Sequence, residues 1–103
     1  MKLLNPEIAS QLPGLYATEE VPPEEKVIVA KFFNPCGAGT WYAAEFDGED
    51  IFFGFADLGD PTCAEWGYFS LQELEGYTNH IGLGIERDRG IEPTAFKNIP
   101  REL

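Results

Sequence analysis

The sequence predicts an α+β fold: a mainly antiparallel meander of four or five strands with two short helices, in a single domain over residues 1–103. Three observations predict it. Aromatic and β-branched runs alternate with Gly, Pro and Asp turn signals along the middle of the chain. Helix-start signals are clear at two places, and both helices that they begin are short. The hydrophobic content of 44% supplies one modest core.

The first element is a short helix that begins at Pro6 and ends before Gly14. Asn5 is suited to cap it, Pro6 suits the first helical position, and Glu7 favours the positive end of the helix dipole. Residues 16–25 (YATEEVPPEE) are proline-rich and acidic, so they predict a loop that leads into the sheet.

Three consecutive strands follow, over residues 26–33, 40–46 and 51–56. They are β-branched and aromatic, and turn-forming residues separate them: 34–39 after the first and Asp47-Gly48 after the second. Successive side chains of a strand point to opposite faces of its sheet. Strict alternation puts Trp41, Ala43 and Glu45 on one face of the second strand, and Tyr42, Ala44 and Phe46 on the other.

A loop over residues 57–64 precedes a fourth strand at 65–69. Ser70 and Glu73 then match a capping box, which predicts a second short helix that ends at Gly76.

The last third of the chain predicts little regular structure. Residues 77–84 are punctuated by glycine and predict a loop, and 85–88 predict a short edge strand. The mixed charges of that strand oppose edge-to-edge pairing with another chain. One helical turn is expected after Thr94.

The charge balance is the most informative global feature. Eighteen acidic residues face seven basic ones, a formal net charge of −11. This argues against direct nucleic-acid binding, because phosphate recognition needs a surplus of Lys and Arg. Aromatic residues make up 14% of the chain, too many for a disordered acidic tail. A folded domain with an acidic surface is expected either to bind a basic protein surface or to contact only solvent.

The expected compartment is the cytoplasm. The first six residues lack the apolar core of a signal peptide, and no apolar run approaches 18 residues, so no membrane contact is expected. Cys36 and Cys63 are therefore expected to be reduced thiols.

No cofactor, metal or catalytic site is expected. His80 is the only histidine, and the two cysteines are distant in sequence, so a zinc site would need all three and a carboxylate. A cysteine nucleophile would need an oriented base, which no local pattern supplies. An enzyme that uses Cys36 or Cys63 remains a third, weaker option beside the two given below.

The acidic residues concentrate in a few segments. Candidate partner-binding acids surround the second hairpin and the following loop: Glu45, Asp47, Glu49, Asp50, Asp57 and Asp60. Four more, Glu19, Glu20, Glu24 and Glu25, crowd the loop before the first strand. The sequence does not decide whether that loop and the Asp47 turn share an end of the sheet. The acids form either a solubilising surface or an imitation of the phosphate rows of nucleic acid.

Several strings resemble a small domain family of uncharacterised function that is carried on bacterial plasmids, phages and conjugative elements. They cover nearly the whole chain: residues 2–7 (KLLNPE), 12–19 (LPGLYATE), 29–35 (VAKFFNP), 40–47 (TWYAAEFD), 52–54 (FFG), 67–74 (GYFSLQEL) and 85–88 (IERD). Within that family, the chain resembles a type II anti-CRISPR protein, an inhibitor of the Cas9 nuclease.

The resemblance implies a non-enzymatic Cas9 inhibitor in the cytoplasm of a bacterial host cell. The acidic patterning adds the hypothesis that it mimics nucleic acid at a basic groove of Cas9 or of its guide-RNA complex. It carries over no site residues, and the motif residues Trp41, Tyr42, Tyr68 and Phe69 are equally explained by core packing. The alternative is an accessory protein of a mobile genetic element that binds another basic host or plasmid protein.

Overall fold

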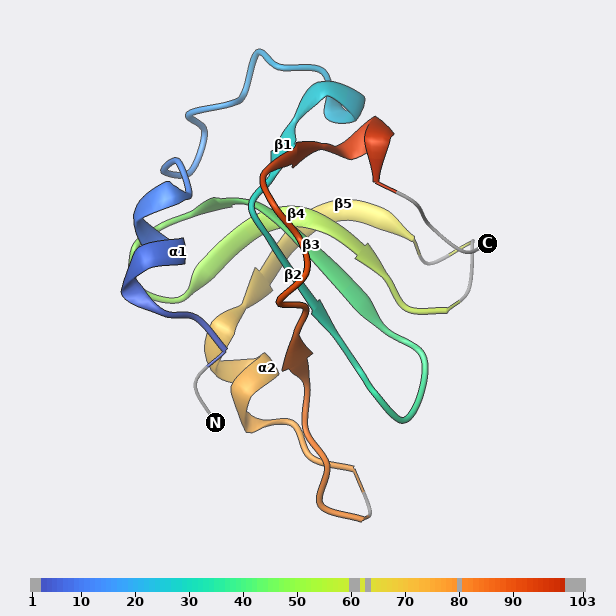
Figure 1. Cartoon of the computed structure of the whole chain (residues 1–103). Helices are drawn as coiled ribbons and strands as arrows, with labels where there is room; N and C mark the ends of the chain where they lie inside the picture. Colours follow the sequence, from blue (N-terminus) through green and yellow to red (C-terminus); the bar gives the residue numbers. More distant parts are fainter. Residues whose placement is uncertain (1–2, 60–61, 63, 80, 100–103) are drawn as a thin grey trace.

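The computed structural model describes residues 3–59, 62, 64–79 and 81–99 (Figure 1). It contains a five-stranded antiparallel sheet in the order β5-β4-β3-β2-β6 and a second sheet that pairs β1 with β7. This confirms the predicted α+β class. The strands are β1 (Val27–Ile28), β2 (Ala30–Phe33), β3 (Thr40–Phe46), β4 (Ile51–Asp57), β5 (Glu65–Ser70), β6 (Glu86–Arg87) and β7 (Thr94–Ala95).

Both predicted helices form with the predicted caps. In α1 (Pro6–Gln11), Asn5 Oδ1 accepts a hydrogen bond from the Ile8 N–H at 2.8 Å. In α2 (Leu71–Gly76), Ser70 Oγ accepts one from the Glu73 N–H at 3.2 Å. Single turns of 3₁₀ helix lie at η1 (Pro23–Glu25) and at η3 (Phe96–Asn98), the latter where a turn was expected after Thr94. No helix in the described ranges is long and apolar enough to cross a membrane.

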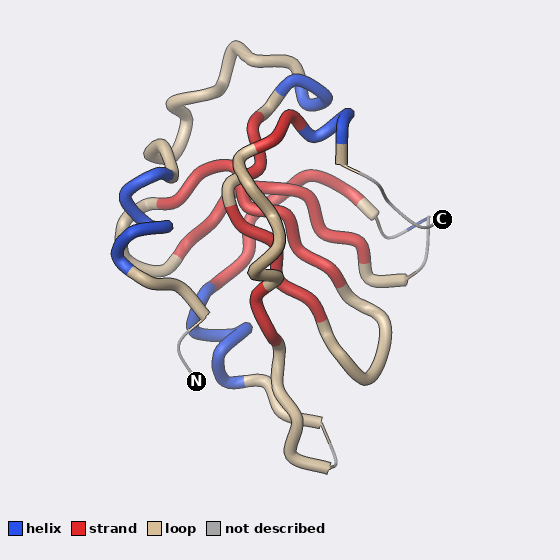
Figure 2. The backbone as a smooth tube through the Cα atoms, in the orientation of Figure 1, coloured by secondary structure: helices blue, strands red, loops and turns tan. Residues whose placement is uncertain are grey.

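The predicted strand over 26–33 is divided in two. β1 pairs with β7, whereas β2 pairs with β3 and, on its other side, with the edge strand β6. The tail folds back beside β1 (Figure 2) and brings Phe96 against the fully buried Ile28. The break between the two strands lies at Val29, and sequence periodicity alone does not show it.

A β-bulge in β3 makes the predicted alternation wrong at its end. Ala43 pairs with Gly54 but Glu45 pairs with Phe53, so the register shifts between them. As a result Phe46 joins the core cluster that contains Ala43, instead of pointing away from it. Gly54 allows β4 to approach β3 closely beside the bulge, because a Cβ at this position would lie 1.8 Å from the Tyr42 carbonyl oxygen.

Apolar side chains form two core clusters. The first lies beneath both helices and includes stacked Phe46 and Phe52, whose ring centroids are 4.6 Å apart. The second contains Tyr42, Phe55 and Phe96. The first cluster holds the helices, and the second holds the C-terminal tail.

Candidate functional site

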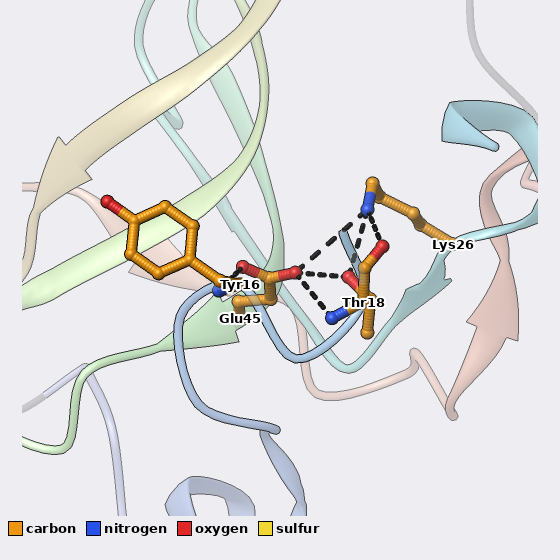
Figure 3. A network of polar contacts seen from close by, with 4 residues as sticks. All are labelled: Tyr16, Thr18, Lys26 and Glu45. Carbon is orange, nitrogen blue, oxygen red and sulfur yellow. Dashed lines mark hydrogen bonds and ion pairs between the residues drawn. The ribbon is translucent and has the colours of Figure 1, made fainter. Parts of the chain in front are cut away.

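Glu45 lies in the interior, which corrects its prediction as a partner-binding acid. The residue is only 3% exposed. Its carboxylate accepts hydrogen bonds from the Tyr16 N–H at 2.8 Å, from the Thr18 N–H at 3.0 Å and from the Thr18 hydroxyl (Figure 3). The bulge turns this side chain toward the loop that precedes the sheet, so it binds that loop and is not accessible to a partner.

Lys26 completes this buried network. It is 5% exposed, and its Nζ lies 3.9 Å from Glu45 Oε2. The ammonium also donates to Thr18 Oγ1 at 2.9 Å and to the Thr18 carbonyl, so Thr18 bridges the two charges. On its other side Nζ lies 5.6 Å from the centre of the Phe53 ring. In the described residues, every buried side-chain nitrogen and oxygen has a hydrogen-bond partner.

The same network holds Tyr16 in an unusual conformation. Tyr16 has φ +69°, in the left-handed region, and it is the only non-glycine residue with positive φ in the described ranges. Its backbone N–H is fixed by Glu45, while its ring points away from the network (Figure 3) and is 64% exposed. The Glu45 carboxylate therefore stabilises a backbone conformation that displays an aromatic side chain.

Tyr68 of β5 is exposed beside Tyr16 and is not a core residue. Trp41 and Phe69 are half-buried and Tyr42 is buried, but Tyr68 is 57% exposed. A side-chain hydrogen bond with Tyr16 raises the pKa of the Tyr68 hydroxyl, and partial desolvation and the negative charges of Glu45 and Glu19 add to this. The Tyr68 ring packs edge-on against Phe53, with centroids 5.2 Å apart. No sequence pattern joins residues 16 and 68, so this pairing could not have been predicted.

In the β3–β4 hairpin, Asp47 organises the turn. Its Oδ1 accepts hydrogen bonds from the backbone N–H groups of Glu49 at 2.8 Å, Asp50 at 2.7 Å and Ile51 at 3.1 Å. The bonds from Asp50 and Glu49 lower the pKa of the Asp47 carboxyl. Asp47 is exposed, but it has a local structural role.

Asp50 and Glu49 differ in what they do. Asp50 Oδ2 accepts from the Ser70 hydroxyl and Oδ1 from the Gln72 N–H, both at 2.7 Å, so it joins the hairpin to the start of α2. Glu49 is exposed and makes no ion pair in the described part of the chain. Glu49 is thus the hairpin acid that can contact a partner without losing a structural bond.

Asp57 lies at the opposite end of the sheet from the hairpin. It ends β4, which has seven residues, so about 20 Å of strand separates it from Asp50. Its Oδ1 accepts from the Gly59 N–H at 3.0 Å. Asp60 lies outside the described residues. The structure thus separates Asp57 from the hairpin acids.

The loop before the sheet shares an end with the Asp47 turn, which answers the question that the sequence left open. Ala30 pairs with Ala43, and Lys26 reaches Glu45, two residues before Asp47. Glu24 and Glu25 immediately precede Lys26. The hairpin acids and this loop therefore lie at the same end of the sheet.

Most of the described basic side chains are engaged within the molecule. Lys26 is buried, Lys31 pairs with Asp88 at 3.7 Å, Lys97 pairs with Glu25, and Arg87 Nε donates to the Leu3 carbonyl at 2.9 Å. Many acids remain without such a partner. In the described ranges the exposed acids that make no ion pair are Glu7, Glu19, Glu20, Glu24, Asp47, Glu49, Glu65, Glu73, Glu86 and Glu92.

The described residues bring together no group of three or more His, Cys, Asp or Glu side chains that could hold a metal ion. Cys36 is exposed in the turn between β2 and β3. Cys63 and His80, the other members of the weak catalytic option, lie outside the described residues. A hollow of about 370 Å³ between that turn and α2 has a mainly apolar lining that includes Trp41, Phe69 and Leu74.

The sequence profile of the protein family of unknown function DUF2958 matches residues 3–97. The chain belongs to this family. No curated protein and no solved structure matches it. These comparisons therefore add no activity or partner to what the geometry indicates.

Proposed function

We propose that this member of the family is a non-enzymatic inhibitor of a type II CRISPR effector nuclease, Cas9, and that it acts by occupying a basic groove of the nuclease. The partner follows from the sequence resemblance to an anti-CRISPR protein. The mode of binding follows from the charge of the molecule. The target is Cas9 or its guide-RNA complex, in which a positively charged channel holds the heteroduplex.

The observation that carries the proposal is the unneutralised acidic surface. The net charge is −11, and most of the described cations are taken up by buried or intramolecular contacts. An exposed field of one sign attracts a surface of the opposite sign and speeds association at low salt. It also repels nucleic acid, so a basic protein surface is the complementary partner.

The partner-facing residues are revised accordingly. Glu49 is the strongest candidate, because its carboxylate is exposed and makes no ion pair in the described residues, and Asp47 is exposed beside it. Glu20 and Glu24 lie in the loop that enters the sheet at the same end. Asp57 is at the other end and would need a second contact region.

The test is a titration of the full chain into a cleavage reaction of guide-loaded Cas9, at low and at moderate salt. We expect inhibition that saturates near equimolar protein and is relieved by salt. Absence of inhibition at large excess, with representative nucleases of each type II subtype, would contradict the proposal. Capture of a different basic protein from the host would then favour the mobile-element accessory role.

Two double charge reversals locate the contact. Glu20→Lys/Glu49→Lys changes the end of the sheet that carries the hairpin. Glu65→Lys/Glu86→Lys makes the same change in net charge at the opposite end, where Glu65 pairs with Ala56 and Glu86 with Phe33. We expect the first pair to weaken inhibition about tenfold at low salt and the second to have a smaller effect. Equal effects would mean that overall charge, not this end, drives binding.

A further inference from the structure

We propose that an aromatic surface formed by the exposed Tyr16 and Tyr68 and the half-buried Phe53, with Glu19 at its rim, is a docking site for arginine side chains of a basic protein partner. The name "Tyr16–Tyr68 surface" is used for these four residues. The inference deepens the proposed function, since it rests on a basic protein as partner and names the side chain that such a partner presents.

Exposure of the two tyrosines is the first argument. Tyr16 and Tyr68 are 64% and 57% exposed, and they come from segments 52 residues apart in the sequence. Phe53 packs against Tyr68 from β4, and Trp66 continues the row with its ring 5.9 Å from Phe53. A row of rings that reaches the surface is typical of interface centres, where Tyr and Trp are enriched.

The conformation of Tyr16 is the second argument. A tyrosine at φ +69° is strained, and such strain persists only where the surroundings enforce it. Here a buried carboxylate enforces it, and that carboxylate is itself kept in the interior by Lys26 and Thr18. A buried ion pair contributes little net stability. A strained backbone held by a buried ion pair is explained by a functional role for the exposed Tyr16 ring, which this arrangement keeps in one position.

The chemistry of the surface indicates the occupant. Aromatic faces attract cations, and arginine is preferred because its planar guanidinium stacks on a ring. Lys26 already places its ammonium 5.6 Å from the centre of Phe53, so this row of rings holds a cation on its inner side. The exposed Glu19 carboxylate lies close enough to affect Tyr68 electrostatically and can pair with a guanidinium.

The negative charge of the chain favours a basic protein over other ligands of this surface. A second copy of the chain, a nucleic acid and an anionic membrane would each bring negative charge toward a molecule of net charge −11. A basic protein brings the complementary charge. Complementarity of charge and the aromatic faces therefore select the same partner.

The test compares peptide binding by the full chain and by two tyrosine variants. The probes are a nine-residue arginine peptide and a nine-residue lysine peptide, titrated by calorimetry at moderate salt. Tyr68→Ser removes a ring from the surface, and Tyr77→Ser removes a tyrosine of 42% exposure that lies after α2, outside the surface. Neither variant changes the charge at neutral pH, so nonspecific attraction is the same in both.

We expect the full chain to bind the arginine peptide more tightly than the lysine peptide. Tyr68→Ser should weaken arginine binding about fivefold and Tyr77→Ser should leave it unchanged. Amide shifts in an NMR titration should centre on Tyr16, Phe53 and Tyr68. Equal arginine affinity in the full chain and Tyr68→Ser, or an equal loss in both variants, would overturn the inference, as would shifts centred elsewhere.

Tyr16→Gly gives a second, independent variant, because glycine accepts the left-handed backbone while the ring is removed. It should lose arginine affinity as Tyr68→Ser does. The Cas9 titration separates the two proposals. Arginine binding at this surface without inhibition retains the inference and rejects Cas9 as target. Inhibition that is unaffected by Tyr68→Ser and Tyr16→Gly rejects the inference and retains Cas9.

Discussion

Replacing Glu45 by Gln tests how the buried network supports the fold. The substitution keeps the shape of the side chain but removes its charge. Glu45 accepts from the Tyr16 N–H, the Thr18 N–H and the Thr18 hydroxyl, with Oε2 accepting both bonds from Thr18. A glutamine amide has one oxygen and one NH₂ group, so at least one of these donors loses its acceptor whichever way the amide is turned.

The magnitude follows from burial. Lys26 is 5% exposed, and Glu45→Gln leaves its ammonium in the interior without a counter-charge. Breaking a buried pair by removing one partner costs about 3–5 kcal/mol. A domain of this size has a free energy of unfolding of roughly 5–15 kcal/mol. We therefore expect the variant to lose a large share of it and the melting temperature to fall by roughly 15–30 °C.

The assay is urea unfolding, followed by tryptophan fluorescence and far-UV circular dichroism. Both tryptophans are half-buried, and the ring centroids of Trp66 and Phe96 are 4.8 Å apart, so tryptophan fluorescence reports on the core. Glu49→Gln is the matched control, because it makes the same chemical change at an exposed residue without an ion pair. It should alter the free energy of unfolding by no more than about 0.5 kcal/mol.

A double-mutant cycle with Lys26→Met completes the test. Methionine keeps an unbranched chain and removes the ammonium, so Glu45→Gln/Lys26→Met leaves no unpaired charge. We expect the double variant to be more stable than the sum of the single losses predicts, by about 2 kcal/mol. A loss below about 1 kcal/mol for Glu45→Gln, together with additivity within about 0.5 kcal/mol, would refute the buried-network reasoning.

Two further predictions concern the backbone at residue 16 and the Asp47 turn. In urea unfolding, the free energy of unfolding of Tyr16→Gly should exceed that of Tyr16→Ala by about 1 kcal/mol, because relief of left-handed strain exceeds the entropy cost of glycine. The opposite order would contradict the strain. The pKa of Asp47 is lowered by backbone hydrogen bonds, so the stabilisation by its ionised form is present above about pH 4 and lost as the pH falls through the lowered pKa. The stability gap between the unchanged chain and Asp47→Asn should accordingly shrink between pH 7 and pH 2, and a gap of constant size would contradict this assignment.

The sequence by itself determined the features that depend on neighbouring residues. Asn5 and Ser70 cap helices through bonds that span three residues, and Asp47 closes a turn whose Gly48 has φ +90°. These interactions form within a few residues whatever the rest of the chain does. The order of β2 to β5 followed as well, because successive strands of a meander lie side by side, whereas the pairing of β6 with β2 joins residues more than 50 positions apart and did not follow from the sequence.

The tertiary structure decided which acids face solvent and which residues meet. Glu45 looked like its acidic neighbours, but the β3 bulge turned it inward, where Lys26 and the backbone of residues 16–18 surround it. Tyr68, an aromatic residue in a strand, was explained equally well by core packing, yet it faces solvent beside Tyr16. Burial and pairing of this kind depend on contacts between residues tens of positions apart, and local pattern does not encode them. The physical reason is that a single shift in strand register exchanges the inner and outer faces of a strand.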